Sequence, residues 1–573
     1  MTMDDVEPDD EPVDDRGARD EPHPFDEASR DADDASTPGD DVARPERRIE
    51  IVAEPVRYRR GPVYALLAVA VIPAIALFAV YRWSDDEADR YEAEVERLEA
   101  ERLLVSGTTT PAAATTTTID DQSNAEADAL SNDGADPSPT EIETELLSYR
   151  RTPTAVAALA NARSLAANLS DFTDRLEPGV CFSASLDGIR VSAHGSSIPF
   201  TPASVQKLVT AAVALEVLGP DHVFETSVAI PPAVEGVVDG DIYLIGGGDP
   251  LLTSDDFPIN DDSRPAFHTT SLDALADAVV QQGITRIRGT VIGDGTRYDD
   301  EFSVDSWASG IAGVDAGPYD ALLVNDARVL GRGVRESDPN VGAAREFVRL
   351  LGERGVRVDN GWGSGVRSTL VPVIATVTSA PVDDVVEEML VNSDNNTAEM
   401  LLKEIGVVAS GEGSREAGLA AAREWLTAND IPTLGVELAD GSGLSNDNKL
   451  TCDVVVAVLQ AVDEDLVASS LPIAGRTGTL DDEFLESPLA GVLRAKTGTL
   501  NIGSVEPPEV KALAGYVPEP TGTIQFAVIA NTPGAASEQV YRTLWNALAE
   551  RLATHPAGPG LDELGPAGLA DDS

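Results

Sequence analysis

Cysteine and histidine are scarce in this sequence, and their scarcity limits the chemistry that the chain can carry. Of 573 residues, 2 are cysteine and 5 are histidine. The histidines are scattered and form no group with the spacing of metal ligands, so we expect neither a metal nor a cofactor, and we disfavour a zinc peptidase. Cys181 and Cys452 either form a disulfide or remain two separate buried thiols, and the sequence leaves both alternatives open.

Basic residues are few compared with acidic ones. The chain has 41 Lys and Arg against 99 Asp and Glu, which gives a formal net charge of -58. Binding to the phosphates of nucleic acid requires a basic surface, so we expect no nucleic acid partner. The acidity favours solubility but does not name a function.

One stretch lacks charge altogether. Residues 61–81 carry no charged side chain, and about 21 residues suffice to cross a bilayer ~30 Å thick. Arg57, Arg59 and Arg60 precede this stretch, whereas acidic residues follow it, and this asymmetry places the N-terminus in the cytoplasm. We therefore predict a single-pass transmembrane helix over residues 61–82, with the folded part of the chain extracellular or periplasmic.

Segments of low complexity surround this helix. We predict a disordered acidic cytoplasmic head at residues 1–56, because it has almost no large apolar side chains. Residues 83–140 read as a stalk helix and a Thr/Pro-rich linker. The tail, residues 554–573, is expected to be disordered.

The folded part shows alternating helix and strand patterns. The dipeptide Asp187-Gly188 predicts a hairpin turn between two short strands. The other strands are expected at residues 240–245, 284–292, 492–496, 512–517 and 523–529. Helices are expected within residues 141–169 and at residues 204–218, 272–283, 397–408, 414–429 and 536–552.

The helix after residue 203 carries the first chemical signal. We predict that Thr201 caps this helix and that Pro202 occupies its first position. Ser204 and Lys207, three residues apart, then share one helix face. A desolvated lysine can accept the proton of a serine hydroxyl and so activate it as a nucleophile.

The Ser-x-x-Lys pair is common by itself, but two later motifs make it part of a specific signature. S-x-x-K, S-D-N and K-T-G, in this order, are the signature of penicillin-binding proteins and class A β-lactamases. The chain contains them as Ser204-x-x-Lys207, Ser393-Asp394-Asn395 and Lys496-Thr497-Gly498. A similar stretch, Arg476-Thr477-Gly478, is a weaker candidate for the third motif, because arginine does not readily share protons.

With these motifs the chain resembles the D-Ala-D-Ala carboxypeptidases/endopeptidases of peptidase family S13, the low-molecular-mass class C penicillin-binding proteins. The resemblance extends over about residues 169–549. It includes residues 244–250, 289–294, 440–445 and 471–475.

The layout and the resemblance imply an α/β (α+β) fold in two parts. One is a discontinuous β-lactamase/transpeptidase-like domain, residues 141–222 and 386–553, in which helices flank an antiparallel sheet. The other is a large, mostly-β inserted domain at residues 223–385, and one transmembrane helix precedes both.

Each motif residue has an expected role. Ser204 is the nucleophile and Lys207 the base, whose pKa should be lowered by burial or by nearby positive charge. Ser393 passes a proton to the leaving amine. Lys496 supplies a second positive charge and attracts the terminal carboxylate of the substrate.

The remaining residues are expected to bind substrate. Asn395 binds the amide on the acyl side, while Thr497 and Thr499 donate hydrogen bonds to the carboxylate. Gly498 leaves room for the substrate backbone along the strand edge. Asp394 supports the loop, and the resemblance implies an oxyanion hole formed by the backbone N–H groups of Ser204 and Thr499.

The expected function is that of a serine-type D-Ala-D-Ala carboxypeptidase or endopeptidase. It would act on peptidoglycan stem peptides ending in D-Ala-D-Ala, and β-lactams would inhibit it covalently. A β-lactamase or esterase on the same fold and a catalytically silent envelope scaffold are the alternatives. The choice between carboxypeptidase and endopeptidase, the role of the insert and the oligomeric state stay open.

Overall fold

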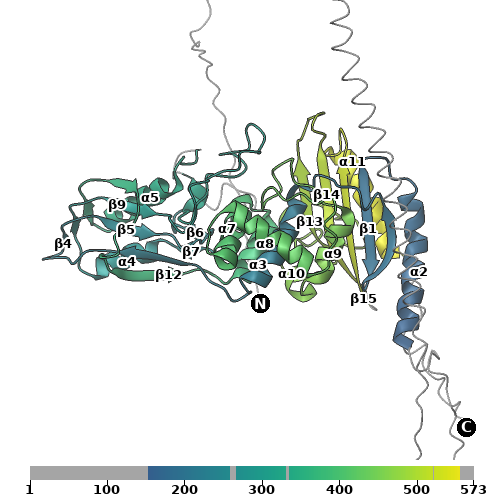
Figure 1. Ribbon diagram of the computed structural model, residues 1–573, viewed down its shortest axis with the longest axis horizontal. Coiled ribbons are helices and arrows are strands. Elements are labelled where there is room, and N and C mark those ends of the chain that lie inside the picture. Colours follow the sequence, from purple (N-terminus) through teal and green to yellow (C-terminus); the bar gives the residue numbers. More distant parts are fainter. Residues whose placement is uncertain (1–152, 258–265, 329, 331–333, 520–521, 555–573) are drawn as a thin grey trace, which may run out of the picture. The chain divides into compact units, whose positions relative to one another are not determined.

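The computed structural model describes residues 153–257, 266–328, 330, 334–519 and 522–554, which form a mixed α/β fold (Figure 1). All of them belong to one unit of the chain, residues 137–573. The predicted head, membrane helix, stalk and linker lie outside the described residues, as does nearly all of the tail. No helix within the described ranges is both long and apolar enough for a membrane span.

An antiparallel sheet of five strands joins early and late parts of the sequence. Its order is β13-β14-β15-β1-β2. The turn between β1 and β2 lies at Asp187 and Gly188, whose positive φ angles of 48° and 77° fit the predicted hairpin. The strands are β1 (Val180–Leu186), β2 (Ile189–His194), β13 (Arg494–Leu500), β14 (Val510–Glu519) and β15 (Gly522–Asn531).

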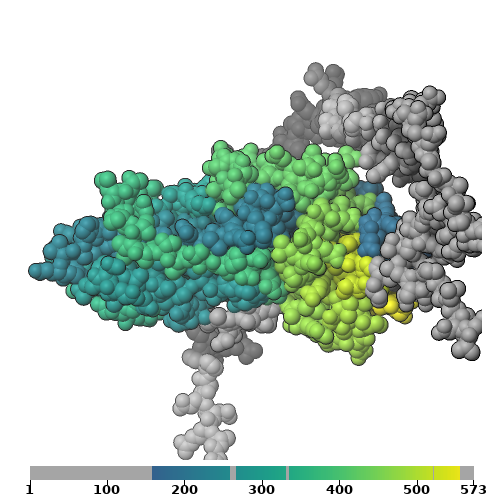
Figure 2. All heavy atoms as spheres, turned by 90° about the horizontal axis from the view of Figure 1, so that it is seen from below, coloured from purple at the N-terminus to yellow at the C-terminus, as the bar shows by residue number. Residues whose placement is uncertain are grey.

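Helices cover both faces of this sheet. Strand β15 alternates between the two cores: Phe526 packs with α2 (Pro153–Thr173) and α11 (Glu538–Thr554), whereas Ala527 packs with α3 (Lys207–Val217) and α9 (Cys452–Ala461). This two-residue period is what a strand buried on both faces requires. In the space-filling view, early residues in blue border late residues in yellow (Figure 2).

The two cysteines of the chain are joined. Cys181 on β1 forms a disulfide with Cys452, the first residue of α9, across a sequence separation of 271. Both residues are fully buried. The disulfide therefore ties the first strand of the sheet to a helix on one of its faces, and it decides between the alternatives that the sequence left open.

The middle of the chain forms a second group of sheets. A five-stranded sheet has the order β11-β9-β5-β3-β12, in which β5, β9 and β11 run parallel. Two smaller sheets have the orders β10-β8-β4 and β6-β7. The strands are β3 (Glu225–Ala229), β4 (Val237–Val238), β5 (Ile242–Ile245), β6 (Leu252–Thr253), β7 (Thr270–Ser271), β8 (Arg286–Ile287), β9 (Val291–Asp294), β10 (Arg357–Val358), β11 (Trp362–Ser364) and β12 (Val373–Thr378).

The described residues of this middle part also form two α-helices, of which only one was predicted. Helix α4 (Asp273–Gln281) lies within the expected range, but α5 (Pro339–Glu353) was missed. Asp338 caps α5 by accepting hydrogen bonds from two backbone N–H groups, and Pro339 is its first residue. Asp followed by Pro is a helix-start signal, so the sequence did contain the information.

The chain then returns to helices, among which α7 (Asn395–Ser410) is central to the site. Arg297 and Tyr298 both bind the Glu404 carboxylate on α7, and Lys403 Nζ lies 2.6 Å from Asp299 Oδ1. These contacts fasten α7 to the loop that follows β9. The remaining helical segments are η1 (Ala203–Gln206), η3 (Asn325–Ala327), α6 (Val382–Asn392), α8 (Arg415–Ala428), α10 (Glu464–Ser469) and η4 (Gly478–Leu480).

The disulfide yields a test of stability. Replacing both Cys181 and Cys452 by Ala should lower the free energy of unfolding by about 2–4 kcal/mol, because the unfolded chain regains the freedom of a long closed loop. Denaturant unfolding of the variant and of the oxidised wild type measures this difference. Reduced wild-type protein is the control for lost packing, and an unchanged midpoint in both would contradict the expectation.

Candidate active site

Ser204 lies in a short 3-10 helix, η1, that leads directly into α3. It is half-buried, whereas its neighbours Ala203 and Val205 are fully buried. The prediction that Thr201 caps this helix is wrong. Its hydroxyl accepts a hydrogen bond from Lys449 Nζ at 2.8 Å, and the helix begins after Pro202 without a side-chain cap.

Lys207, the first residue of α3, directs its amine at three oxygen atoms. Its Nζ lies 3.1 Å from Ser204 Oγ, 2.6 Å from Asn395 Oδ1 and 2.8 Å from the backbone carbonyl oxygen of Ser442. The side chain is fully buried. The structure thus brings together the hydroxyl and the amine that the sequence paired.

Burial dominates the electrostatics of this amine. It lowers the pKa of Lys207 from its usual range to about 8, although the carboxylates of Asp394, Asp440 and Glu399 act in the opposite direction. The cause is desolvation, one of the two alternatives expected from the sequence. At pH 7 about a tenth of the amine is therefore neutral and available to accept a proton, and this fraction rises toward pH 8.

Ser393 and Lys496 form a second hydroxyl–amine pair. Ser393 ends α6 in a left-handed conformation with φ 61°, which turns the chain sharply into α7. Lys496 Nζ lies 2.8 Å from Ser393 Oγ and 2.9 Å from the backbone oxygen of Thr497. Asp394 caps α7 by accepting a hydrogen bond from Thr397 N, which is the supporting role expected of it.

Asn395 has partners that the sequence did not indicate. Its Oδ1 accepts from Lys207, and its Nδ2 donates to the backbone oxygen of Asp315 at 3.0 Å. Asp315 belongs to the loop after β9, so this amide joins the loop to Lys207. Its expected role in holding the substrate amide would require it to exchange one of these partners.

The threonines around the third motif are also engaged. Thr497 Oγ1 donates to Thr479 Oγ1 at 2.9 Å, and Thr499 Oγ1 accepts from Lys511 Nζ at 3.0 Å. Thr499 keeps its own hydroxyl hydrogen for a further acceptor, such as a carboxylate.

Gly498 is packed closely against the segment that precedes Ser204, which leaves no room for a side chain. A Cβ at this position would come within 2.8 Å of the Pro202 carbonyl oxygen and 3.2 Å of Ala203 Cβ. The strand edge therefore passes directly against the segment that carries Ser204. The absence of a side chain here serves this close approach inside the protein, besides any room that it leaves for a substrate.

The weaker third-motif candidate lies next to the stronger one. Among the described residues, Lys496 and not Arg476 contacts Ser393. The second Thr-Gly-Thr run nevertheless contributes Thr479, which contacts Thr497. The structure thus favours Lys496, and it gives the second run a supporting position that sequence reasoning did not assign.

Sequence reasoning missed a buried framework behind Lys207. Asp440 accepts hydrogen bonds from Gly443 N, Ser445 N and Asn448 Nδ2, each at 2.7 Å, and from Trp307 Nε1. It thereby shapes residues 440–445, which we call the strap. The Asp-Gly-Ser-Gly pattern of the strap was noticed as a resemblance, but nothing in it signals that a backbone carbonyl meets the lysine.

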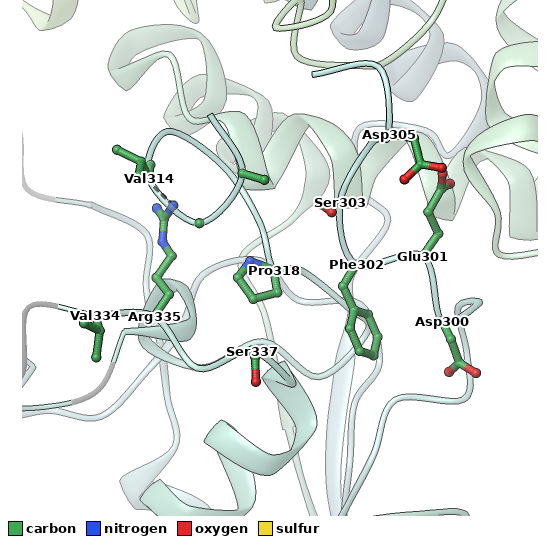
Figure 3. Close-up of a pocket in the computed structure, with 12 residues that line it drawn as sticks. Asp300, Glu301, Phe302, Ser303, Asp305, Val314, Pro318, Val334, Arg335 and Ser337 are labelled. Carbon is green, nitrogen blue, oxygen red and sulfur yellow. Dashed lines mark hydrogen bonds between the residues drawn. The ribbon is translucent and has the colours of Figure 1, made fainter. Parts of the chain in front are cut away.

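A cavity lies beside the loop after β9, and Ser204 is not among its lining residues. It has a volume of about 860 Å³, and no motif residue lines it. Figure 3 shows Arg335 pointing toward Val314, whose backbone oxygen it binds at 2.8 Å. Asp300, Glu301 and Asp305 line the same cavity.

One histidine lies close to two carboxylates on the surface. The candidate ligand atoms of His268, Asp384 and Glu387 lie within 4.8 Å of one another. The two ring nitrogens face different carboxylates, with Nε2 3.1 Å from Glu387 and Nδ1 3.8 Å from Asp384. His268 therefore lies between two acids, one at each ring nitrogen.

Comparisons with known proteins agree with this geometry. The family model described as D-Ala-D-Ala carboxypeptidase 3 (S13) matches residues 162–332 and 321–555. The D-alanyl-D-alanine carboxypeptidase of Actinomadura sp. (strain R39) is 31% identical over 462 residues, covering 66% of this chain and 81% of that protein.

Solved structures share the fold. Penicillin binding protein 4 from Haemophilus influenzae has a TM-score of 0.55 at 21% identity, covering 68% of this chain and all of that one. The same protein in complex with a novel β-lactam gives a TM-score of 0.51 at 20% identity, covering 67% and 98%. With its motifs assembled and its family model matched over most of the described residues, the chain belongs to the D-Ala-D-Ala carboxypeptidase 3 (S13) family.

Proposed function

We propose that this protein is a serine-type D-Ala-D-Ala carboxypeptidase or endopeptidase that acts on peptidoglycan stem peptides through an acyl-enzyme. The observation that carries the proposal is the position of Lys207 Nζ, 3.1 Å from Ser204 Oγ, combined with a pKa of about 8. A hydroxyl beside a largely desolvated amine is an activated nucleophile. The relative from Actinomadura bears the name of the same activity.

In the first chemical step, Ser204 Oγ forms a bond to the carbonyl carbon of the scissile peptide while its proton passes to Lys207. The backbone N–H groups of Ser204 and Thr499 stabilise the resulting oxyanion, and loss of one such donor costs about 10²–10³ in rate in other enzymes. The half-buried position of Ser204 leaves its hydroxyl accessible to a substrate.

In the second step the carbon–nitrogen bond breaks and the leaving amine takes a proton through the Ser393 hydroxyl. Lys496, 2.8 Å from Ser393 Oγ, supports this transfer and attracts the terminal carboxylate of the peptide. Thr499 has a hydroxyl hydrogen to offer the same carboxylate, and Thr497 does so after exchanging its bond with Thr479. Water then hydrolyses the ester and frees Ser204.

The same nucleophile accounts for β-lactam binding. A β-lactam presents a strained amide to Ser204, and ring opening leaves an acyl-enzyme that hydrolyses slowly. Penicillin binding protein 4 from Haemophilus influenzae, whose fold this chain shares, has been solved in complex with a β-lactam.

We further propose the division of the chain and its location. Residues 141–222 and 386–553 form the catalytic domain and residues 223–385 the inserted one, which is supported by sheets that draw their strands from these parts separately. One helix at residues 61–82 anchors the chain with its catalytic part outside the cytoplasm. A disulfide between Cys181 and Cys452 supports an oxidising compartment.

The nucleophile is tested by covalent labelling. A fluorescent penicillin should label the wild type, and Ser204→Ala should abolish labelling because, among the described residues, only the Ser204 hydroxyl forms a hydrogen bond with Lys207 Nζ. Ser227→Ala, which removes an exposed hydroxyl on β3, is the matched control and should label normally. Equal labelling of the Ser204 and Ser227 variants would refute the assignment.

The base is tested by the pH dependence of acylation. Below a pH of about 8 the Lys207 amine is mostly protonated and cannot accept the serine proton, so the acylation rate should rise as the pH increases through about 8. Stopped-flow measurement with a chromogenic β-lactam gives this midpoint. Lys207→Arg, which stays charged, should acylate far more slowly at every pH, and a flat wild-type profile would contradict the role of Lys207.

The natural reaction is tested on cell-wall fragments. Muropeptides incubated with the enzyme should lose a terminal D-Ala if it acts as a carboxypeptidase, or cross-linked dimers should disappear if it acts as an endopeptidase. Mass spectrometry distinguishes the two products. Rapid β-lactam hydrolysis without either product would instead indicate the β-lactamase alternative.

A further inference from the structure

The hydrogen bonds of Lys207 constrain where its lone pair can point. A neutral amine has two N–H groups and one lone pair, and only the lone pair can take a proton from Ser204. The other two partners, Asn395 Oδ1 and the Ser442 carbonyl, are acceptors without a hydrogen to give. The amide of Asn395 cannot be reversed without loss, because its Nδ2 faces the Asp315 carbonyl.

When both N–H groups go to these two acceptors, the lone pair faces Ser204. The base is therefore oriented by the places of Asn395 Oδ1 and of the Ser442 carbonyl. Asn395 is held by its position at the start of α7. The Ser442 carbonyl belongs to the strap, so its position depends on the contacts that hold the strap.

Glu399 holds the strap from behind. Its Oε1 accepts from Ser442 N at 2.8 Å and from Gly441 N at 3.1 Å, and its Oε2 lies 3.2 Å from Gly441 N. Thr210 Oγ1 adds a hydrogen bond to the Gly441 carbonyl at 2.7 Å. The strap backbone is thus anchored at the residue whose carbonyl meets Lys207.

Glu399 is fully buried, and nothing assigned so far explains a carboxylate there. Burial and then the nearby Asp440 raise its pKa. Tyr319, Arg415 and Lys207 are the other ionisable groups that interact electrostatically with it. Burying an ionisable side chain costs free energy of folding unless its hydrogen bonds compensate for the lost solvation.

We propose that Glu399 is a positioning residue that orients the Lys207 lone pair toward Ser204 by holding the Ser442 carbonyl in place. The proposal rests on the function proposed above. Asn395 and Glu399 are four residues apart on α7, so one helix face sets both acceptors of the base. A single rigid element then determines the direction of proton transfer.

Two substitutions separate the hydrogen bonds of Glu399 from its charge. Glu399→Ala removes both, so the strap loses its anchor and acylation by a chromogenic β-lactam should slow by about 100-fold, as expected when a catalytic group is misplaced by about 1 Å. Glu399→Gln keeps an amide oxygen where Oε1 accepts from Gly441 and Ser442. Its acylation rate should stay within a few-fold of the wild type.

The negative charge of Glu399 should affect the midpoint of the pH profile of acylation. The Glu399 carboxylate favours the protonated form of Lys207, so Glu399→Gln should move the midpoint of the acylation profile to lower pH. A residue that merely stabilised the fold would reduce the amount of active protein without moving this midpoint. Glu346→Gln, the same change at a buried acid on α5, is the matched control and should leave rate and midpoint unchanged.

The outcomes decide between the proposals. A Glu399→Ala protein that acylates at the wild-type rate would overturn the positioning role, as would a Glu346→Gln protein that slows equally. If Glu399→Ala does not fold, the Glu399→Gln profile decides, and an unmoved midpoint overturns the role. A wild type that no β-lactam labels would overturn both this inference and the proposed function.

Discussion

The burial of one lysine amine is the constraint on which the site depends. Lys207 has no solvent-exposed surface, so its amine must find its partners inside the protein. It finds one hydroxyl and two carbonyl-type oxygens, and desolvation brings its pKa to about 8. The same burial that would be a cost elsewhere raises the neutral fraction of the amine, the only form that can accept a proton. The segments around Lys207 must therefore place their oxygen atoms within hydrogen-bond distance of its amine.

Helix α7 is where these requirements meet. Its first residue, Asn395, binds Lys207, and Glu399 one turn later holds the strap. Farther along, Glu404 binds Arg297 from the loop after β9. The same loop returns to the site through the Asp315 carbonyl. The middle part of the chain therefore contributes to the geometry around Lys207 even though it holds none of the three motifs.

Local signals in the sequence predicted most elements that are governed by neighbouring residues. The hairpin at Asp187, most of the helix expected at residues 204–218 and the late strands follow from turn residues and apolar periodicity, although the α-helix itself begins only at Lys207. The same reasoning missed α5, although the Asp338-Pro339 start signal is present in the sequence. It also assigned Thr201 as the cap of the Ser204 helix, which has no side-chain cap. Thr201 failed as a cap because Lys449, distant in sequence, binds its hydroxyl.

By itself the sequence determined the three motifs, the residue types that carry the chemistry and the family that they resemble. Only the tertiary structure decided which atoms orient them. The Ser442 carbonyl is a backbone group, and every residue has one. No side-chain pattern could therefore predict that it contacts the amine of Lys207, 235 positions earlier in the chain. The pairing of Cys181 with Cys452 and the buried place of Glu399 likewise depend on which distant segments pack together, and local residue preferences do not contain that information.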